Sequence, residues 1–183
     1  PTLAFTRLLS GPMDFTPGIV DMTFNGLDGW NRPQTTIAKQ LASYVVIYSP
    51  IQMAADLPEN YVKHPQALEF IESVVTDWER SAAIAGEVGE YLVQARQARG
   101  EARWFVGGLT DETPRKLDIP LSFLDAGMDY ELVLYSDAKD ANWRTAPERL
   151  SVSRQRVNRE SILTVSMVAS GGFAAELRPL NRD

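Results

Sequence analysis

Apolar positions in the first 75 residues follow helical spacing. From Pro33 to Asp56, apolar side chains recur every three or four residues, which predicts a helix with a broad buried face. Thr35 or Thr36 is suited to cap its start, and Pro50 is expected to kink it, because proline removes an amide donor. The stretch HPQALEFIESVV, residues 64–75, predicts a second helix. The apolar positions of the two helices are Ile37, Leu41, Tyr44, Val45, Tyr48, Leu68, Ile71 and Val75.

After Asp77 the pattern changes to alternation, which is typical of strands with one buried face. In RKLDIPL, the apolar side chains of Leu117, Ile119 and Leu121 alternate with Lys116, Asp118 and Pro120. Short strands with no helices between them predict an antiparallel β-sandwich. The expected strands cover residues 91–100, 103–110, 115–121, 129–138, 161–170 and 173–180.

The chain therefore divides into a helical part, residues 1–75, and an all-β part, residues 76–183. Two helices cannot bury their apolar faces alone, so the first part needs a larger body to pack on. We interpret residues 1–75 as the end of a larger domain.

Composition excludes several classes of function. Apolar residues make up 44% of the 183 and charged residues 23%, as in an ordinary globular protein. The net charge of −6 is spread over both parts and argues against a nucleic-acid partner. The absence of cysteine excludes disulfides, thiolate zinc sites and cysteine nucleophiles. Residues 1–20 show no secretion signal, and the longest apolar stretch, 42–53, is too short to span a bilayer.

Four stretches carry a resemblance to a known family. They are LAFTRLLSGPMDFTPG at 3–18, TTIAKQLASYVVIYSPIQMAADLPENY at 35–61, VTDWERSAAIAGEVGEYLVQARQARG at 75–100, and RWFVGGLTDETPRKLDIPLSFLDAG at 103–127. Together they resemble the C-terminal region of glycoside hydrolase family 97. Because the stretches are long and in order over nearly the whole chain, the resemblance is specific.

The resemblance implies an α+β fold in which residues 1–75 are the last β/α unit of a (β/α)₈ catalytic barrel, with GPMDF as its eighth strand. Residues 76–183 would be the C-terminal antiparallel sandwich. A whole barrel needs about 250 residues, so its other strands lie outside this sequence. The resemblance also implies a calcium ion and a periplasmic or secreted address. The family motifs that carry the acid, the base or nucleophile and the calcium-binding glutamates, HExxKPTG and REGxxGxE, do not occur here. We therefore expect no catalytic and no metal-binding residue in this chain.

Four residues are candidates for substrate binding. If GPMDF is the eighth strand, Asp14, Phe15 and Thr16 lie at its C-terminal end, the barrel face where active sites are built. Asp14 could bind a sugar hydroxyl or orient a catalytic partner. Alternatively, it accepts hydrogen bonds from backbone amides or from Arg7 and fixes a turn. Trp30, in the long loop that follows, could stack on a sugar ring or pack beneath that loop. Phe24 and Asn31 lie in the same loop.

Other conspicuous side chains favour structural roles. Asp56 and Glu59 follow the first helix, at the barrel face opposite the active site, where capping and domain contacts are expected. For His64, between the helices, we expect a solvated or capping role. Trp78 and Trp104 would anchor the sandwich to the barrel or fill its core, although a sugar-binding surface remains an alternative. The basic run with Arg154, Arg156 and Arg159 indicates a solvated strand edge that discourages pairing.

Two functions follow. The chain is expected to be the C-terminal segment of a calcium-dependent, exo-acting α-glycosidase that acts on terminal α-glucosides of oligosaccharides and whose carboxylate pair lies upstream. The isolated chain would then be inactive. The alternative is a non-catalytic carbohydrate-binding or interaction module. The sequence separates neither glucosidase from galactosidase nor retention from inversion, because the carboxylate pair lies outside it.

Overall fold

The computed structural model describes residues 1–24, 26 and 31–180. Its helices are α1 (Thr2–Phe5), α2 (Ile37–Val46), α3 (Pro58–Lys63) and α4 (Pro65–Ser73), and a 3₁₀ turn, η1, covers Arg7–Ser10. Its strands are β1 (Trp78–Glu87), β2 (Tyr91–Ala98), β3 (Trp104–Thr110), β4 (Arg115–Pro120), β5 (Asp129–Asp137), β6 (Leu150–Asn158), β7 (Ile162–Met167) and β8 (Gly172–Pro179).

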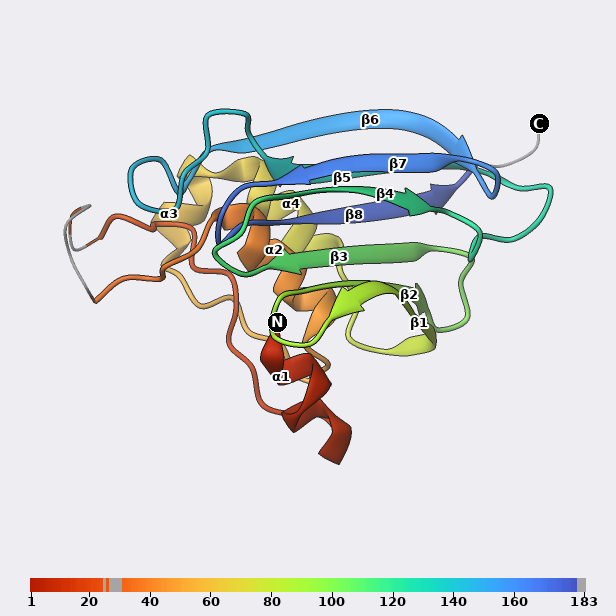
Figure 1. Ribbon diagram of the computed structural model, residues 1–183, viewed down its shortest axis with the longest axis horizontal. Helices are drawn as coiled ribbons and strands as arrows, with labels where there is room; N and C mark the ends of the chain where they lie inside the picture. The colour runs from red at the N-terminus through yellow and green to blue at the C-terminus, as the bar shows by residue number, and fades with distance from the viewer. Residues whose placement is uncertain (25, 27–30, 181–183) are drawn as a thin grey trace.

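The strands form two antiparallel sheets, as the alternating pattern predicts. Six strands pair in the order β1-β2-β3-β8-β5-β6, and β4 pairs with β7 in a second, smaller sheet. Figure 1 shows the small sheet lying over one face of the large one and helices α2 and α4 on the other. The all-β part is thus a sandwich, but its large sheet is covered on both faces.

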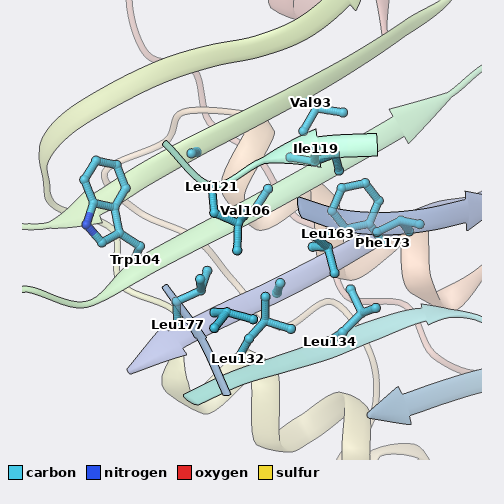
Figure 2. Packing of buried hydrophobic residues seen from close by; sticks show 14 of the residues in the cluster. Val93, Trp104, Val106, Ile119, Leu121, Leu132, Leu134, Leu163, Phe173 and Leu177 are labelled. Carbon is cyan, nitrogen blue, oxygen red and sulfur yellow. The ribbon is translucent and has the colours of Figure 1, made fainter. Parts of the chain in front are cut away.

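The core between the two sheets is built mainly from side chains of β2, β3, β5 and β8 on one side and of β4 and β7 on the other (Figure 2). Trp104 and Val106 of β3 face Ile119 and Leu163 of the small sheet, and all four are at most 2% exposed. A Cβ on Gly108 would overlap the ring of Phe173, so the absence of a side chain there makes room for this aromatic residue. The full cluster is Val93, Ala95, Trp104, Val106, Ile119, Leu121, Leu124, Tyr130, Leu132, Leu134, Val157, Leu163, Val165, Met167, Phe173, Ala175 and Leu177.

A second core lies between the large sheet and the helices. Ile37 and Leu41 of α2 and Phe70 of α4 pack with Phe105 and Tyr135 on the outer face of the sheet. The expectation of a single buried face is therefore wrong for the central strands. Every residue of β3 is buried, and in β8 even Glu176 is inaccessible. Arg103 and Arg178 pair with this carboxylate, which compensates its removal from water.

Helix α2 starts as predicted and ends earlier than predicted. Thr36 is its N-cap, and the side-chain oxygen accepts a hydrogen bond from the amide of Lys39. The helix stops at Val46 and does not continue, kinked, to Asp56. Pro50 is part of the reason, because proline disfavours helical backbone at the residue before it. The chain then forms α3, which was not expected, and α4, which begins at Pro65 as expected.

The segment expected to be a barrel strand, GPMDF at 11–15, forms no ladder with the described residues. Phe15 makes one isolated parallel bridge with Gln52. Since the partners of a barrel strand would lie upstream, the assignment of residues 1–75 to a barrel stays a prediction.

Both edges of the large sheet are charged. Strand β1, which the alternating pattern did not reveal, forms one edge, and β6 forms the other. Arg154 and Arg156 of β6 pair with Glu69 and Asp129, so the basic run does mark a strand edge.

Candidate functional site

The three described candidates for substrate binding lie together on the surface. Asp14 and Thr16 are exposed, and Phe15 is half-buried. Among the described residues, no hydrogen bond reaches the Asp14 carboxylate, and Arg7 instead donates to the carbonyl of Gly11 at 3.3 Å. The structural alternative for Asp14 therefore finds no support in the described part of the chain. Its role in sugar binding stays a prediction. Trp30 lies outside the described residues.

These candidates lead into a segment we call the connecting loop, residues 17–36, of which 17–24, 26 and 31–36 are described. Its first turn is held by two buried tyrosines. The hydroxyl of Tyr44 lies 3.1 Å from the carbonyl oxygen of Pro17, and that of Tyr61 donates to the carbonyl of Gly18 at 2.8 Å. Gly18 has φ +95°, and a Cβ there would overlap the Tyr44 hydroxyl, so glycine is required. Burial raises the pKa of both tyrosines, which keeps their hydroxyls protonated as donors.

Asp56 holds the next two residues of the connecting loop. Its Oδ2 accepts hydrogen bonds from the amides of Val20 and Asp21, both at 2.8 Å. Its Oδ1 accepts from the amide of Leu57 and from the side chain of Asn60 at 2.7 Å. Partial burial alone would raise the pKa of Asp56, but these hydrogen bonds outweigh it and lower the pKa. Asp56 is thus a structural anion, but it does not cap helix α3, whose N-cap is Leu57 and which has no side-chain cap hydrogen bond.

A residue that the sequence analysis did not single out, Glu148, holds the loop one residue further on. Glu148 belongs to the β5–β6 loop, residues 138–149. Its Oε1 accepts from the amide of Met22 at 2.9 Å and from the hydroxyl of Thr23 at 3.3 Å. Its Oε2 lies 3.6 Å from Nε2 of His64. His64 is the N-cap residue of helix α4, as the expected capping role allows, but its side chain makes no cap hydrogen bond and lies beside the β5–β6 loop instead.

Arg32 joins the far end of the connecting loop to the same β5–β6 loop. The side chain is buried, and its two terminal nitrogens donate to the carbonyls of Trp143 and Arg144, each at 2.9 Å. The guanidinium of Arg144 in turn stacks on the Trp143 ring, 4.6 Å from its centroid. Finally, the amide of Ile37 donates to the carbonyl of Pro147 at 3.0 Å.

An open groove runs beside these contacts. It is lined by Thr23, His64, Thr145, Ala146, Pro147, Glu148 and Arg149. Most of these side chains are polar, as is usual for a solvent-exposed surface.

Of the two tryptophans expected to anchor the sandwich to the barrel or fill its core, Trp104 fills the core and Trp78 packs in the second core. Trp104 lies in the core between the sheets, while Trp78 packs edge-to-face on Phe105 beneath the helices, with ring centroids 5.6 Å apart. Both are at least 93% buried, so neither offers a sugar-binding face.

Within residues 1–24, 26 and 31–180, no three His, Asp or Glu side chains gather closely enough to hold a metal ion. No helix in the described part is long and apolar enough to cross a membrane.

Comparisons with known proteins agree with one another. The family model described as "Glycosyl-hydrolase 97 C-terminal, oligomerisation" matches residues 77–178. A retaining α-galactosidase from Bacteroides thetaiotaomicron is 34% identical over 180 residues, which is 96% of this chain and 26% of that protein. A probable retaining α-galactosidase from Streptomyces bingchenggensis is 34% identical over 178 residues, 95% of this chain and 25% of that protein.

The solved structures extend the match to the whole chain. A glycoside hydrolase family 97 enzyme from Pseudoalteromonas sp. strain K8, in complex with acarbose, superposes with a TM-score of 0.96 at 49% identity. The match covers 98% of this chain and 28% of that enzyme, and the same holds for its complex with panose. The chain thus spans about a quarter of the length of the relatives it matches.

Proposed function

We propose that this chain, which belongs to glycoside hydrolase family 97 and matches the C-terminal part of its enzymes, completes the catalytic barrel of an exo-acting α-glycosidase. In the same proposal, the sandwich supports that barrel. In this proposal residues 1–75 are the last β/α unit, and Asp14, Phe15 and Thr16 face the substrate. The reaction needs two carboxylates across the scissile bond, and these lie upstream. The calcium ligands and a periplasmic or secreted address also belong to the full-length enzyme.

The observation that carries this proposal is the uneven distribution of exposed apolar side chains. Large apolar residues stay exposed mainly in the first 62 residues, whereas few do so in the sandwich, and this favours a missing body that covers them. A self-sufficient module would not be expected to leave this surface open. The exposed large apolar residues are Leu3, Leu9, Phe24, Ile51, Met53, Leu57 and Val62 in residues 1–62, and Val88, Ile162 and Leu180 in the sandwich.

For the substrate we propose a terminal α-glucoside. The family 97 enzyme at 49% identity is in complex with acarbose and panose, which contain glucose-type rings, while the relatives named α-galactosidase are 34% identical. The greater identity favours the glucoside.

A second role, compatible with the first, is subunit contact. It is favoured by the description of the matching family model, which includes oligomerisation. In that role the sandwich would join copies of the enzyme while the barrel performs catalysis.

The test compares the full-length enzyme with the 183-residue chain on nitrophenyl α-glucoside and α-galactoside. We expect the full-length enzyme to hydrolyse the glucoside faster, calcium chelation to lower its rate, and the isolated chain to be inactive. Hydrolysis by the isolated chain would refute the assignment of the chemistry to upstream residues. A full-length enzyme that hydrolyses neither substrate would favour the non-catalytic module.

A further inference from the structure

We propose that two copies of the enzyme join through the sandwich, with strand β7 of each copy pairing with strand β6 of the other. The inference rests on the second role in the proposed function, subunit contact, and names the surface that performs it. It uses only described residues of the sandwich and needs no contact with substrate.

The first support is the free edge of β7. The amide of Leu121 donates to the carbonyl of Ser161 at 3.0 Å, and this bond continues the ladder between β4 and β7. Because an antiparallel ladder alternates between bonded and non-bonded pairs, the backbone groups of every second residue of β7 point away from β4. These residues are Ile162, Thr164 and Ser166, and no hydrogen bond between described residues occupies their amides or carbonyls.

This edge lacks the features that keep sheet edges from pairing, such as charges, proline and bulges. The other edge of the small sheet, β4, has two of them, because Lys116 and Asp118 are charged and Pro120 has no amide to donate. In the large sheet, β1 is interrupted by two register shifts. The exposed residues of β7 are uncharged, and Ile162 is 66% exposed. Such an edge is expected to be covered by another strand.

The second support is an exposed face of β6 beside this edge. Ser153 and Gln155 of β6 lie opposite Leu134 and Leu132 of β5, so all these side chains point toward the small sheet. The two leucines are buried in the core between the sheets, whereas Ser153 and Gln155 are exposed. The large sheet therefore extends beyond β7, and Figure 1 shows β6 and β7 at the same rim of the molecule. We call this exposed face of β6 the open step; it is formed by Ser151, Ser153 and Gln155.

The open step decides how a second copy can bind. If β7 paired with β7 of the partner subunit, the two large sheets would lie on the same side of the new sheet, and the two β6 strands, which extend beyond β7, would collide. A two-fold rotation about an axis parallel to the strands instead places β6 of each copy beside β7 of the other. The two open steps then face each other across the axis, and the two strand contacts are equivalent, as in an isologous dimer.

The directions and faces of the two strands agree with this arrangement. Strand β6 ends at Asn158 and β7 begins at Ile162, a connection too short to return along the strand, so the two strands run in opposite directions. After the rotation, β7 is therefore antiparallel to β6 of the partner subunit. The amide of Ala138 donates to the carbonyl of Arg149 in the ladder between β5 and β6, which leaves the backbone groups of alternate residues, among them Arg154, at the free edge. In both strands these residues point away from the core between the sheets, so the pairing joins two core faces into one.

Charge favours this pairing over a contact between two β6 strands. Arg154 and Arg156 both lie at the free edge, so a contact of β6 with itself would bring the arginines of both copies together. The free edge of β7 presents uncharged side chains instead. The hydroxyl of Thr164 donates to Oδ1 of Asp118 at 2.6 Å, which places a carboxylate on the next strand. The arginines therefore oppose pairing of β6 with itself and permit pairing with β7.

A second copy is the partner that the position of this surface favours. The family model whose description includes oligomerisation matches residues 77–178, which contain both strands. The helices that precede residue 77 cover the other face of the large sheet, and Figure 1 places α1 on the far side of the molecule from β6. The part of the enzyme upstream of this chain is therefore attached away from the open step.

The experiment measures the dimer dissociation constant of the full-length enzyme by sedimentation equilibrium. Thr164→Lys places a positive charge opposite the arginines of the partner's β6, while Asp118 can still pair with that charge within its own sheet. Ala83→Lys is the matched control, because it adds the same charge at an exposed position of β1, the opposite edge of the large sheet. The melting temperature of each variant reports on its fold. Hydrogen exchange of the β7 amides is measured in wild type at low and high protein concentration.

We expect Thr164→Lys to raise the dissociation constant about thirtyfold, because like charges weaken two equivalent contacts, and Ala83→Lys to leave it unchanged. The amides of Ile162, Thr164 and Ser166 should exchange slowly in the dimer and rapidly in the dilute monomer. If Thr164→Lys does not fold, this exchange decides.

Equal dissociation constants for the two variants, or β7 amides that exchange equally fast at both concentrations, overturn the proposed surface while subunit contact stands. A wild-type enzyme that stays monomeric at every concentration overturns subunit contact itself, and with it the proposed surface.

Discussion

At the scale of single residues, Asp137 is the buried acid whose charge the fold least accommodates. It ends strand β5, is 8% exposed, and its Oδ2 accepts from the amides of Val168 and Gly172, both at 3.0 Å. Its Oδ1 has no hydrogen-bond partner in the described part of the chain. Burial raises the pKa of Asp137 to about 6, although the side chain of Thr36, the two amides and Lys39 oppose the shift.

This shift predicts a pH-dependent stability. A carboxyl whose pKa is higher folded than unfolded binds more protons in the folded state, so its contribution is fully present below about pH 4 and is lost as pH rises through 6. Asp137→Asn keeps an acceptor for the two amides and removes the charge. Relative to wild type, the variant should gain about 2 kcal/mol between pH 4.5 and 8, measured by urea unfolding of the 183-residue chain.

The comparison across pH is the test, because an unsatisfied Asn amide would lower stability equally at both pH values. Asp140→Asn is the matched control, since Asp140 is exposed and pairs only loosely with Arg149, at 3.5 Å. Parallel pH profiles for wild type and Asp137→Asn would show that the carboxyl titrates normally in the folded protein.

At the scale of elements, the close packing of helix α2 on the large sheet depends on Gly107. A Cβ at this position of β3 would lie 2.7 Å from the carbonyl oxygen of Ala42 and 2.9 Å from Cβ of Val45. Both belong to the helix, and neither can rotate away. Gly107→Ala should therefore shift α2 and destabilise the chain by about 2 kcal/mol, a typical cost of overpacking.

A lower urea midpoint for Gly107→Ala, with altered near-ultraviolet circular dichroism, would check this. Gly86→Ala is the control within the same sheet, where a Cβ would meet the ends of the Leu92 and Phe5 side chains at 3.1 Å and the carbonyl oxygen of Tyr91 at 3.2 Å. The side-chain ends can move, and this carbonyl is farther away than the one that Gly107 faces, so the variant should lose less than half as much. Equal losses for the two would mean that the helix does not constrain Gly107.

The same helix shows how far sequence reasoning extends. Its start was predictable, because the capping chemistry of Thr36 is local. Its end was not, because the last carbonyls are satisfied by distant side chains. The guanidinium of Arg96, on β2, donates to the carbonyl of Val45 at 2.7 Å, and the side chain of Gln52 donates to that of Tyr44 at 2.8 Å. Because the apolar residues that follow Val46 stay buried outside the helix, the sequence pattern predicts a longer helix than the structure has.

The candidate site, too, was predictable from the sequence only in part. The family resemblance led to Asp14, Phe15 and Thr16, which lie together on the surface. Glu148 and Arg32 could not be found, because they act on backbone atoms 126 and 111 residues away, and residue type does not reveal such partners. The surplus of polar residues in the β5–β6 loop was the one signal available, and it is common to most loops.

At the scale of the whole molecule, the boundary near residue 76 passes through a shared core. The family model begins at residue 77, yet the outer face of the large sheet is buried by helices that precede it. Without those helices the sheet would expose Phe105, Val133 and Tyr135, each now fully buried. At about 2 kcal/mol per buried apolar side chain, this loss is comparable with the stability of a small domain.

A chain of residues 77–183 should therefore lack cooperative unfolding in urea and should elute as aggregates in size-exclusion chromatography. A chain of residues 11–183, which keeps α2, α4 and the buried Val20 and Met22 but lacks α1 and η1, should unfold cooperatively like the full 183 residues. The two shortened chains differ by the helices that cover the sheet and the loop residues packed with them, so the comparison isolates the contribution of the second core. A sharp, two-state transition for residues 77–183 would establish that the sandwich folds without its helices, and that the second core is an interface between independent domains.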